Sequence, residues 1–140
     1  MIDLDILSTR LSQAHHGEAL LDVFIALAFF KPDGAVIAAK ASRKRDRVIY
    51  TYAYNYAHNG GRYTHGTSTA ARVSYSLDNA LRLFKRHFPH LTASMTVDTD
   101  RNSVTLWRDS RCVYHCDHAT MALALCQAMV QAKILGEDAE

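Results

Sequence analysis

The sequence predicts a mixed α/β (α+β) fold in which an antiparallel sheet of three to five strands is covered by helices. Three observations predict this class. Residues 75–89 carry an apolar stripe at the spacing of an amphipathic helix. Residues 48–56 alternate between two faces, as a half-buried strand does. Residues 93–117 form three short alternating runs separated by tight turns, the pattern of an antiparallel meander. We expect the order α-α-β-(β)-α-β-β-β-α in a single domain, residues 1–140.

Two helices are expected before the first strand. Residues 2–14 have leucines at helical spacing, and His15-His16-Gly17 ends that pattern. Residues 18–30 are apolar on nearly every side, so this second helix should be among the most buried elements. The turn-forming residues 31–34, Lys-Pro-Asp-Gly, close it.

The middle of the chain is predicted to contain one clear strand between two exposed insertions. Residues 36–47 begin alanine-rich and become basic, and we expect a mostly irregular basic loop there. Residues 48–56 form the strand, followed by a turn at 58–61. Residues 57–74 are expected to be a polar loop, with a short edge strand as the alternative for 62–72.

The second half of the chain has the more explicit signals. Ser76 is placed to cap the 75–89 helix, and Pro89 ends it. Strands are predicted at 93–98, 103–108 and 112–117, with a hairpin turn at 98–102 in preference to a calcium loop. Thr120 should cap a last helix, 120–135, which Gly136 stops before a frayed acidic tail, 136–140.

Composition is that of a globular protein. The 140 residues are 49% hydrophobic and 21% charged, and no apolar run approaches the roughly 20 residues that cross a bilayer. The three cysteines are an odd number and no signal peptide precedes the first helix, which favours a reducing cytoplasm and no membrane partner. Charge is uneven: residues 40–72 hold seven Lys and Arg against one Asp, which indicates an anion-facing surface.

Three stretches carry a resemblance to a known family. Residues 18–28 (EALLDVFIALA), 75–83 (YSLDNALRL) and 119–128 (ATMALALCQA) are similar, in this order and spacing, to helices of the phage "ABA sandwich" domain proteins. Residues 104–107 (VTLW) lie where such proteins often have a tryptophan strand. The resemblance implies a phage or prophage origin and a sheet flanked by helices. It supplies no catalytic residues.

A tyrosine row beside the basic segment is the first candidate site. Tyrosines at alternate positions of one strand form a row of rings that could stack bases, while the neighbouring arginines pair with phosphates. The alternative is that the rings fill a sheet–helix or subunit interface, and that the basic run KASRKRDR is a solvated loop. The ligand-binding residues that this hypothesis names are Arg43, Lys44, Arg45, Arg47, Tyr50, Tyr52, Tyr54, Arg62, Tyr63, His65 and Arg72.

Histidines and cysteines suggest two weaker sites. His58 and His65 share a predicted loop and could act as general acid and base, as in two-histidine phosphodiesterases. Residues 112–118 (CVYHCDH) suggest zinc, but strand alternation turns His115 away from Cys112, Cys116 and His118. We therefore expect buried thiols and a rim histidine, with no metal and no cofactor.

These observations lead to a functional hypothesis. We expect a non-catalytic binding protein of a phage or prophage, acting in the host bacterial cytoplasm as a counter-defence protein. It would hold an anionic ligand, a nucleotide signal or nucleic acid, on the basic, tyrosine-rich surface, and would form a homo-oligomer through apolar or tyrosine-rich surface. Two alternatives remain open: an inhibitor that binds a host defence protein, similar to an anti-CRISPR protein, and a small phosphodiesterase that uses His58 and His65.

Overall fold

Four helices and six strands make up the part of the chain that the computed structural model describes, residues 3–30, 35–44, 47–55 and 63–138. Side chains are described for residues 3–30, 40–42, 47–52 and 66–138. In chain order the elements are α1 (Leu4–Gln13), α2 (Ala19–Phe29), β1 (Ala35–Lys44), β2 (Arg47–Asn55), β3 (Tyr63–Ala71), α3 (Leu77–His87), β4 (Thr92–Val97), β5 (Asn102–Arg108), β6 (Arg111–His118) and α4 (Met121–Ile134).

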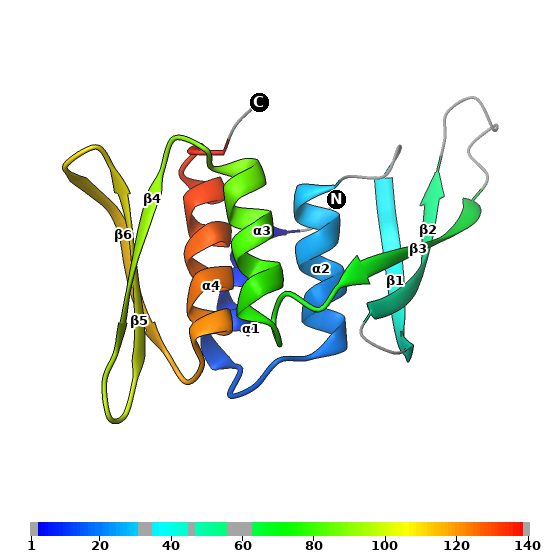
Figure 1. The fold of residues 1–140 in the computed structure, drawn as a ribbon. Coiled ribbons are helices and arrows are strands. Elements are labelled where there is room, and N and C mark those ends of the chain that lie inside the picture. Colours follow the sequence, from blue (N-terminus) through cyan, green and yellow to red (C-terminus); the bar gives the residue numbers. More distant parts are fainter. Residues whose placement is uncertain (1–2, 31–34, 45–46, 56–62, 139–140) are drawn as a thin grey trace.

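The helices lie between two antiparallel sheets (Figure 1). One sheet has the order β1-β2-β3 and packs on α2, and the other has the order β4-β5-β6 and packs on α4. The predicted α+β class, with antiparallel strands covered by helices, is confirmed. The layers differ from the sheet flanked by helices that the family resemblance implied, because α2 and α4 are apolar on nearly all sides and take the interior.

Residues 36–47, predicted as an irregular basic loop, belong mostly to a strand, so that prediction is wrong. β1 pairs antiparallel with β2, from Ala35 opposite Asn55 to Lys44 opposite Arg47. Alanine has a low strand propensity, but the backbone groups of β2 need partners on both sides, and this requirement overrides the local preference.

The predicted polar loop 57–74 also contains a strand. β3 pairs with the other side of β2, from Tyr63 opposite Asn55 to Ala71 opposite Arg47. Residues 62–72 are thus an edge strand over most of their length, as the alternative prediction had it. β2 is the central strand of this sheet.

The helix caps and the helix stop predicted in the second half of the chain agree with the structure. Ser76 Oγ accepts from the Asn79 N–H at 3.3 Å and Thr120 Oγ1 from the Leu123 N–H at 3.2 Å, so both predicted caps are confirmed. Gly136 takes a φ of 77° just after Leu135, the C-cap of α4, as expected of a helix stop. Within the described residues, no helix is both long enough and apolar enough to cross a bilayer.

The two faces of α2 bury side chains in two separate apolar clusters. Leu21, Ile25 and Ala28 join the larger core, which also contains α1, α3, α4 and the inner face of the β4-β5-β6 sheet. Val23 and Leu27 pack against the β1-β2-β3 sheet. α2 is therefore the element that holds the first sheet to the rest of the molecule.

Candidate anion-binding cleft

The tyrosine face of β2 points toward α2. Val48 and Tyr50 are buried there, at 0% and 4% exposure, and pack on Val23 and Leu27. The half-buried Tyr52 packs on the same cluster, with its ring 5.7 Å from that of Tyr50. Tyr50 is thus part of the sheet–helix interface, and its predicted role in an exposed stacking platform is wrong. Its ring gains more from burial against α2 than from contact with water.

The remaining predicted site residues are only partly brought together. Arg47 is exposed at the start of β2, where its guanidinium lies 3.4 Å from Thr69 Oγ1. Arg72 is half-buried, with its guanidinium carbon 3.9 Å from the centre of the Tyr75 ring. The structure gives the strand positions, but not the side chains, of Arg43, Lys44, Tyr54, Tyr63 and His65. Arg45, His58 and Arg62 lie outside the described residues.

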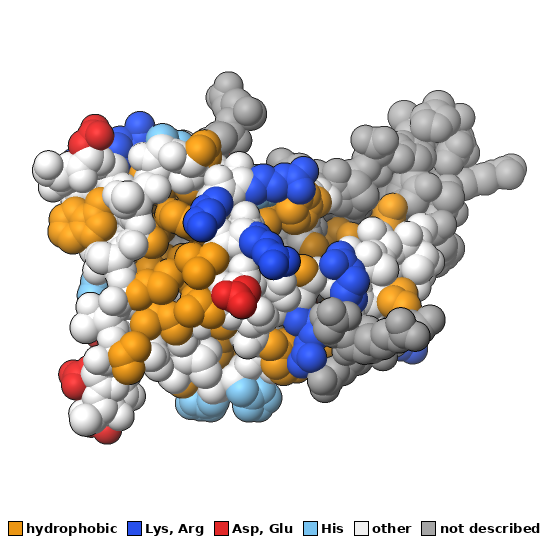
Figure 2. Space-filling view, viewed as in Figure 1, with side chains coloured by type: hydrophobic (Ala, Val, Ile, Leu, Met, Phe, Trp, Pro, Cys, Tyr) orange, Lys and Arg blue, Asp and Glu red, His pale blue; other side chains and the backbone are white. Residues whose placement is uncertain are grey.

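Arg47 instead belongs to a cleft that joins it to α3. The cleft lies between α2, α3 and the ends of β2 and β3, and has a volume of about 230 Å³. Figure 2 shows Lys and Arg side chains gathered in the middle of this face, over α3 and toward the β1-β2-β3 sheet. The lining comprises the basic and polar side chains of Arg47, Asn79, Arg82, Arg86 and Asp22, and the apolar ones of Ile25, Ala26, Phe30, Ala71, Val73 and Leu83.

Two turns of α3 present the arginines of one wall. Arg82 and Arg86 are four residues apart, so they lie on the same face of the helix, and both are exposed. The Arg86 guanidinium lies 4.8 Å from the centre of the Phe30 ring. Arg47 faces them from β2. Among the described carboxylates, none forms an ion pair with Arg47, Arg82 or Arg86. Their charge remains available to a ligand.

A carboxylate lies at the floor of this basic cleft. Asp22 on α2 has no exposed surface, and its Oδ1 accepts from the Ser74 N–H at 2.7 Å and the Ser74 hydroxyl at 2.6 Å. Its Oδ2 is buried with no hydrogen-bond partner among the described residues. Burial raises the pKa of Asp22 to about 6, although the hydrogen bonds from Ser74 and the charge of Arg72 act in the opposite direction.

The histidines and cysteines of β6 lie apart from the cleft and on two faces. Cys116 and His118 are buried, and His115 is exposed on the outer face, as strand alternation predicted. Cys112 is exposed as well, contrary to the prediction, because a register shift between Leu106 and Trp107 reverses the alternation before it. The described residues contain no cluster of three or more metal-binding side chains.

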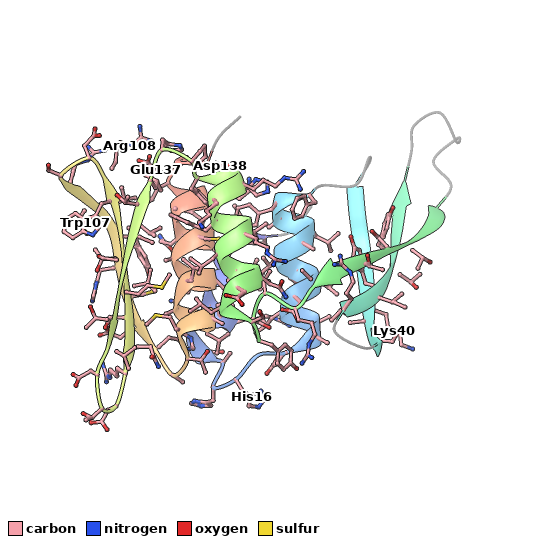
Figure 3. All side chains as sticks on the ribbon, in the orientation of Figure 1. His16, Lys40, Trp107, Arg108, Glu137 and Asp138 are labelled. Carbon is pink, nitrogen blue, oxygen red and sulfur yellow. The ribbon has the colours of Figure 1, made fainter. Side chains whose placement is uncertain are left out.

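The outer face of the β4-β5-β6 sheet has its own polar network. Thr105 Oγ1 lies 2.6 Å from His115 Nδ1, and the Ser103 hydroxyl donates to Asp117. His115 Nε2 is 3.4 Å from the same carboxylate. Figure 3 labels Trp107 at this sheet; its indole N–H donates to Ser94 Oγ at 2.8 Å. These groups therefore satisfy one another on the outer face of the sheet.

Sequence reasoning missed Asp22, Arg82 and Arg86 as site residues. The apolar stripe of residues 75–89 places Arg82 and Arg86 on the opposite, polar face of the helix, a position that by itself indicates no site. The signal that could have found them is the i, i+3, i+7 spacing of Asn79, Arg82 and Arg86, which places three polar groups in one stripe. Asp22 gives a second signal, as a charged residue within an otherwise apolar helix.

Comparison with known proteins gives no relative for this chain: no protein-family model, no curated protein and no solved structure matches it.

Proposed function

We propose that this protein is a non-catalytic binding protein that holds an anionic ligand, a nucleotide or a segment of nucleic acid, in the cleft between α2 and α3. The observation that carries the proposal is the set of Arg47, Arg82 and Arg86 around an apolar recess, with no described carboxylate paired to them. Guanidinium groups form strong, often bidentate hydrogen bonds with phosphate oxygens, each contributing about 1.5–3 kcal/mol.

The shape of the cleft supports a ligand with both charge and an apolar part. The arginines line its basic side, whereas Ile25, Phe30 and Val73 add apolar surface that a base or sugar can cover. The cleft volume of about 230 Å³ lies below the roughly 300–1,000 Å³ of typical small-molecule sites, so the cleft would hold a phosphate group and part of the attached nucleoside. The rest of a nucleotide, or a longer strand, would extend over the basic face of α3.

The family resemblance supports a biological setting for this activity. Phage proteins act inside the host cell, where nucleotide signals and nucleases serve in immunity. We propose that the protein acts in the host bacterial cytoplasm as a counter-defence protein. It would sequester a nucleotide immune signal or block a host nuclease complex, acting as a homo-oligomer.

A retention experiment tests this function. The purified protein is incubated with a panel of linear and cyclic nucleotides, freed of unbound ligand and denatured, and the released material is identified by mass spectrometry. We expect an intact nucleotide, retained at low salt and lost at high salt. A chemically altered nucleotide would contradict the non-catalytic assignment and direct attention to His58 and His65. Retention of no nucleotide would refute the nucleotide ligand, and pull-down from host extract would then test the protein-inhibitor alternative.

A further inference from the structure

The position of Asp22 conflicts with simple anion binding. A carboxylate beneath a bound phosphate repels it, and the low local dielectric strengthens the repulsion. Asp22 is nevertheless at the floor of the cleft, fully buried, with Ser74 bonded to one oxygen and no described partner for the other. A protonated Asp22 removes this conflict, because the carboxylic acid has no charge.

The charged side chains nearest to Asp22 are arginines, which do not change charge near neutral pH. Arg72 approaches from the segment after β3, and its own Nε is buried without a described partner. Arg47, Arg82 and Arg86 line the cleft from β2 and α3, and all four arginines stay charged.

The other elements around α2 bring no further charge that titrates near Asp22. From α4 comes the Cys126 thiol, whose pKa burial raises far above its usual range, so it stays neutral. α1 places Arg10 over Phe24, on another side of α2, and Lys40 of β1 is exposed. The described side chains of β3, residues 66–71, carry no charge. Within these groups, Asp22 is the one that titrates between pH 5 and 8.

We propose that anion binding in the cleft is coupled to the uptake of one proton by Asp22, so that the protein binds its ligand more tightly in mildly acidic than in mildly alkaline solution. This inference rests on the proposed function. The proton comes from the solvent and adds to Oδ2, because Oδ1 already accepts two hydrogen bonds from Ser74. It returns to the solvent when the anion leaves. By linkage, a bound anion lowers the acid dissociation constant of Asp22 by the same factor by which protonation of Asp22 raises the affinity for the anion.

His87 is the group that could imitate this effect. Its ring lies 5.1 Å from that of Phe30, which lines the cleft. Burial, followed by the charges of Arg86 and Lys133, lowers the pKa of His87, so this histidine gains a positive charge only in acid. That charge would also attract an anion at low pH. A test must therefore separate Asp22 from His87.

Sulfate is the appropriate probe, because its charge stays constant over the pH range of interest. Sulfate is titrated into the wild type, Asp22→Asn and His87→Gln at about pH 5.5 and about pH 7.5, with binding followed by amide chemical shifts. We expect the wild type and H87Q to bind about fivefold or more tightly at the lower pH. D22N should bind with the same affinity at both, close to that of the wild type at the lower pH. An H87Q variant that loses the pH dependence, with D22N keeping it, would overturn the inference.

A second measurement keeps the inference testable if D22N folds poorly. The Asp22 carboxyl carbon of the wild-type protein is titrated by NMR with and without saturating sulfate, and the midpoint should move to higher pH with the anion. The Ser74 hydroxyl donates to Asp22 and thereby lowers the pKa of Asp22. Ser74→Ala removes this hydrogen bond and should move the titration midpoint of Asp22 to higher pH even without sulfate.

An unchanged midpoint of Asp22 on addition of sulfate would refute the coupling. Sulfate binding that is equal at both pH values in the wild type would refute the coupling and leave the proposed function intact. Absence of sulfate binding at either pH would refute both.

Discussion

Polar side chains are arranged in opposite ways in two regions of the molecule. On the outer face of the β4-β5-β6 sheet, hydroxyl, imidazole and carboxylate groups bond to one another, and Arg101 lies 3.7 Å from Asp117. In the cleft beside the β1-β2-β3 sheet, three arginines have no described acidic partner and a buried carboxylate is only half satisfied. Unused hydrogen-bonding capacity and unpaired charge mark a place where a ligand can contribute what the chain does not. The comparison therefore supports a structural role for the first region and the proposed binding role for the second.

The largest predicted effect on stability concerns Asp22. Its folded pKa of about 6 exceeds the unfolded value of 3.8, so the folded state holds the proton more tightly. The stability that Asp22 contributes is complete below about pH 4 and is lost as the pH rises through 6. We expect the free energy of unfolding of the wild type to fall by up to about 3 kcal/mol relative to Asp22→Asn over this window.

Urea unfolding at a series of pH values measures this difference. Asp78→Asn, at an exposed position of α3, is the matched control and should keep the pH dependence of the wild type. Parallel pH profiles for the wild type and D22N would show that folding does not raise the pKa of Asp22. The contrast between the two regions would then lose its main support.

A buried polar group that is fully satisfied should cost stability when removed and leave binding unchanged. His118 Nε2 donates to the Leu11 carbonyl at 2.6 Å, and Nδ1 accepts from the Ala119 N–H at 2.8 Å. We expect His118→Ala to lower the free energy of unfolding by about 2 kcal/mol, because the buried Leu11 carbonyl and the part-buried Ala119 N–H lose their partner. Thermal unfolding tests this, with the exposed His90→Ala as control. A loss of anion binding in folded H118A would contradict the division of roles.

The packing of Tyr52 gives a smaller effect at the other sheet. A Cβ added to Gly66 would lie 2.7 Å from Cζ of Tyr52, and the end of that ring would have to move. We expect Gly66→Ala to lower the free energy of unfolding by about 1 kcal/mol, because the added methyl group overpacks against the end of the half-buried Tyr52 ring. The neighbouring Thr67→Ala is exposed and should change little. An unaltered stability of G66A would show that Tyr52 is not held between the sheet and α2.

The smallest effect is expected on the outer face of the β4-β5-β6 sheet. The Ser103 hydroxyl is the main cause that lowers the pKa of Asp117, ahead of the charges of His115 and Arg101. Ser103→Ala should therefore raise the pKa of Asp117 in an NMR titration and leave both the unfolding midpoint and anion binding unchanged. A clear loss of anion binding would place function on this face instead of the cleft.

Local signals in the sequence predicted one half of the fold well. Ser76 and Thr120 cap helices as expected, and the turn at 98–102 closes the β4-β5 hairpin, with the Asp98 N–H donating to the Arg101 carbonyl. These features depend on neighbours within a few residues. β1 was missed because its alanines favour no strand by themselves, and only pairing with β2 makes them one.

The candidate site could be predicted only in part, because it depends on tertiary contacts. Arg47 was named from the basic segment, and the structure places it beside a cleft. Arg82, Arg86 and Asp22 come from two helices far from it in the sequence, and no local pattern brings the three elements together. Period-2 alternation predicts that the tyrosines share one face of a strand, but it does not predict which face of the strand packs on a helix.

One measurement tests the central claim most directly: sulfate affinity in two double variants that lower the net charge equally. Arg82→Ala/Arg86→Ala removes two arginines of the cleft, and Arg101→Ala/Arg111→Ala removes one from the turn between β4 and β5 and one from β6. We predict that the first variant binds sulfate at least about tenfold more weakly than the wild type, because charge-assisted hydrogen bonds are lost. The second should stay within about twofold. Equal weakening in both variants, or none in the first, would contradict the assignment of binding to this cleft.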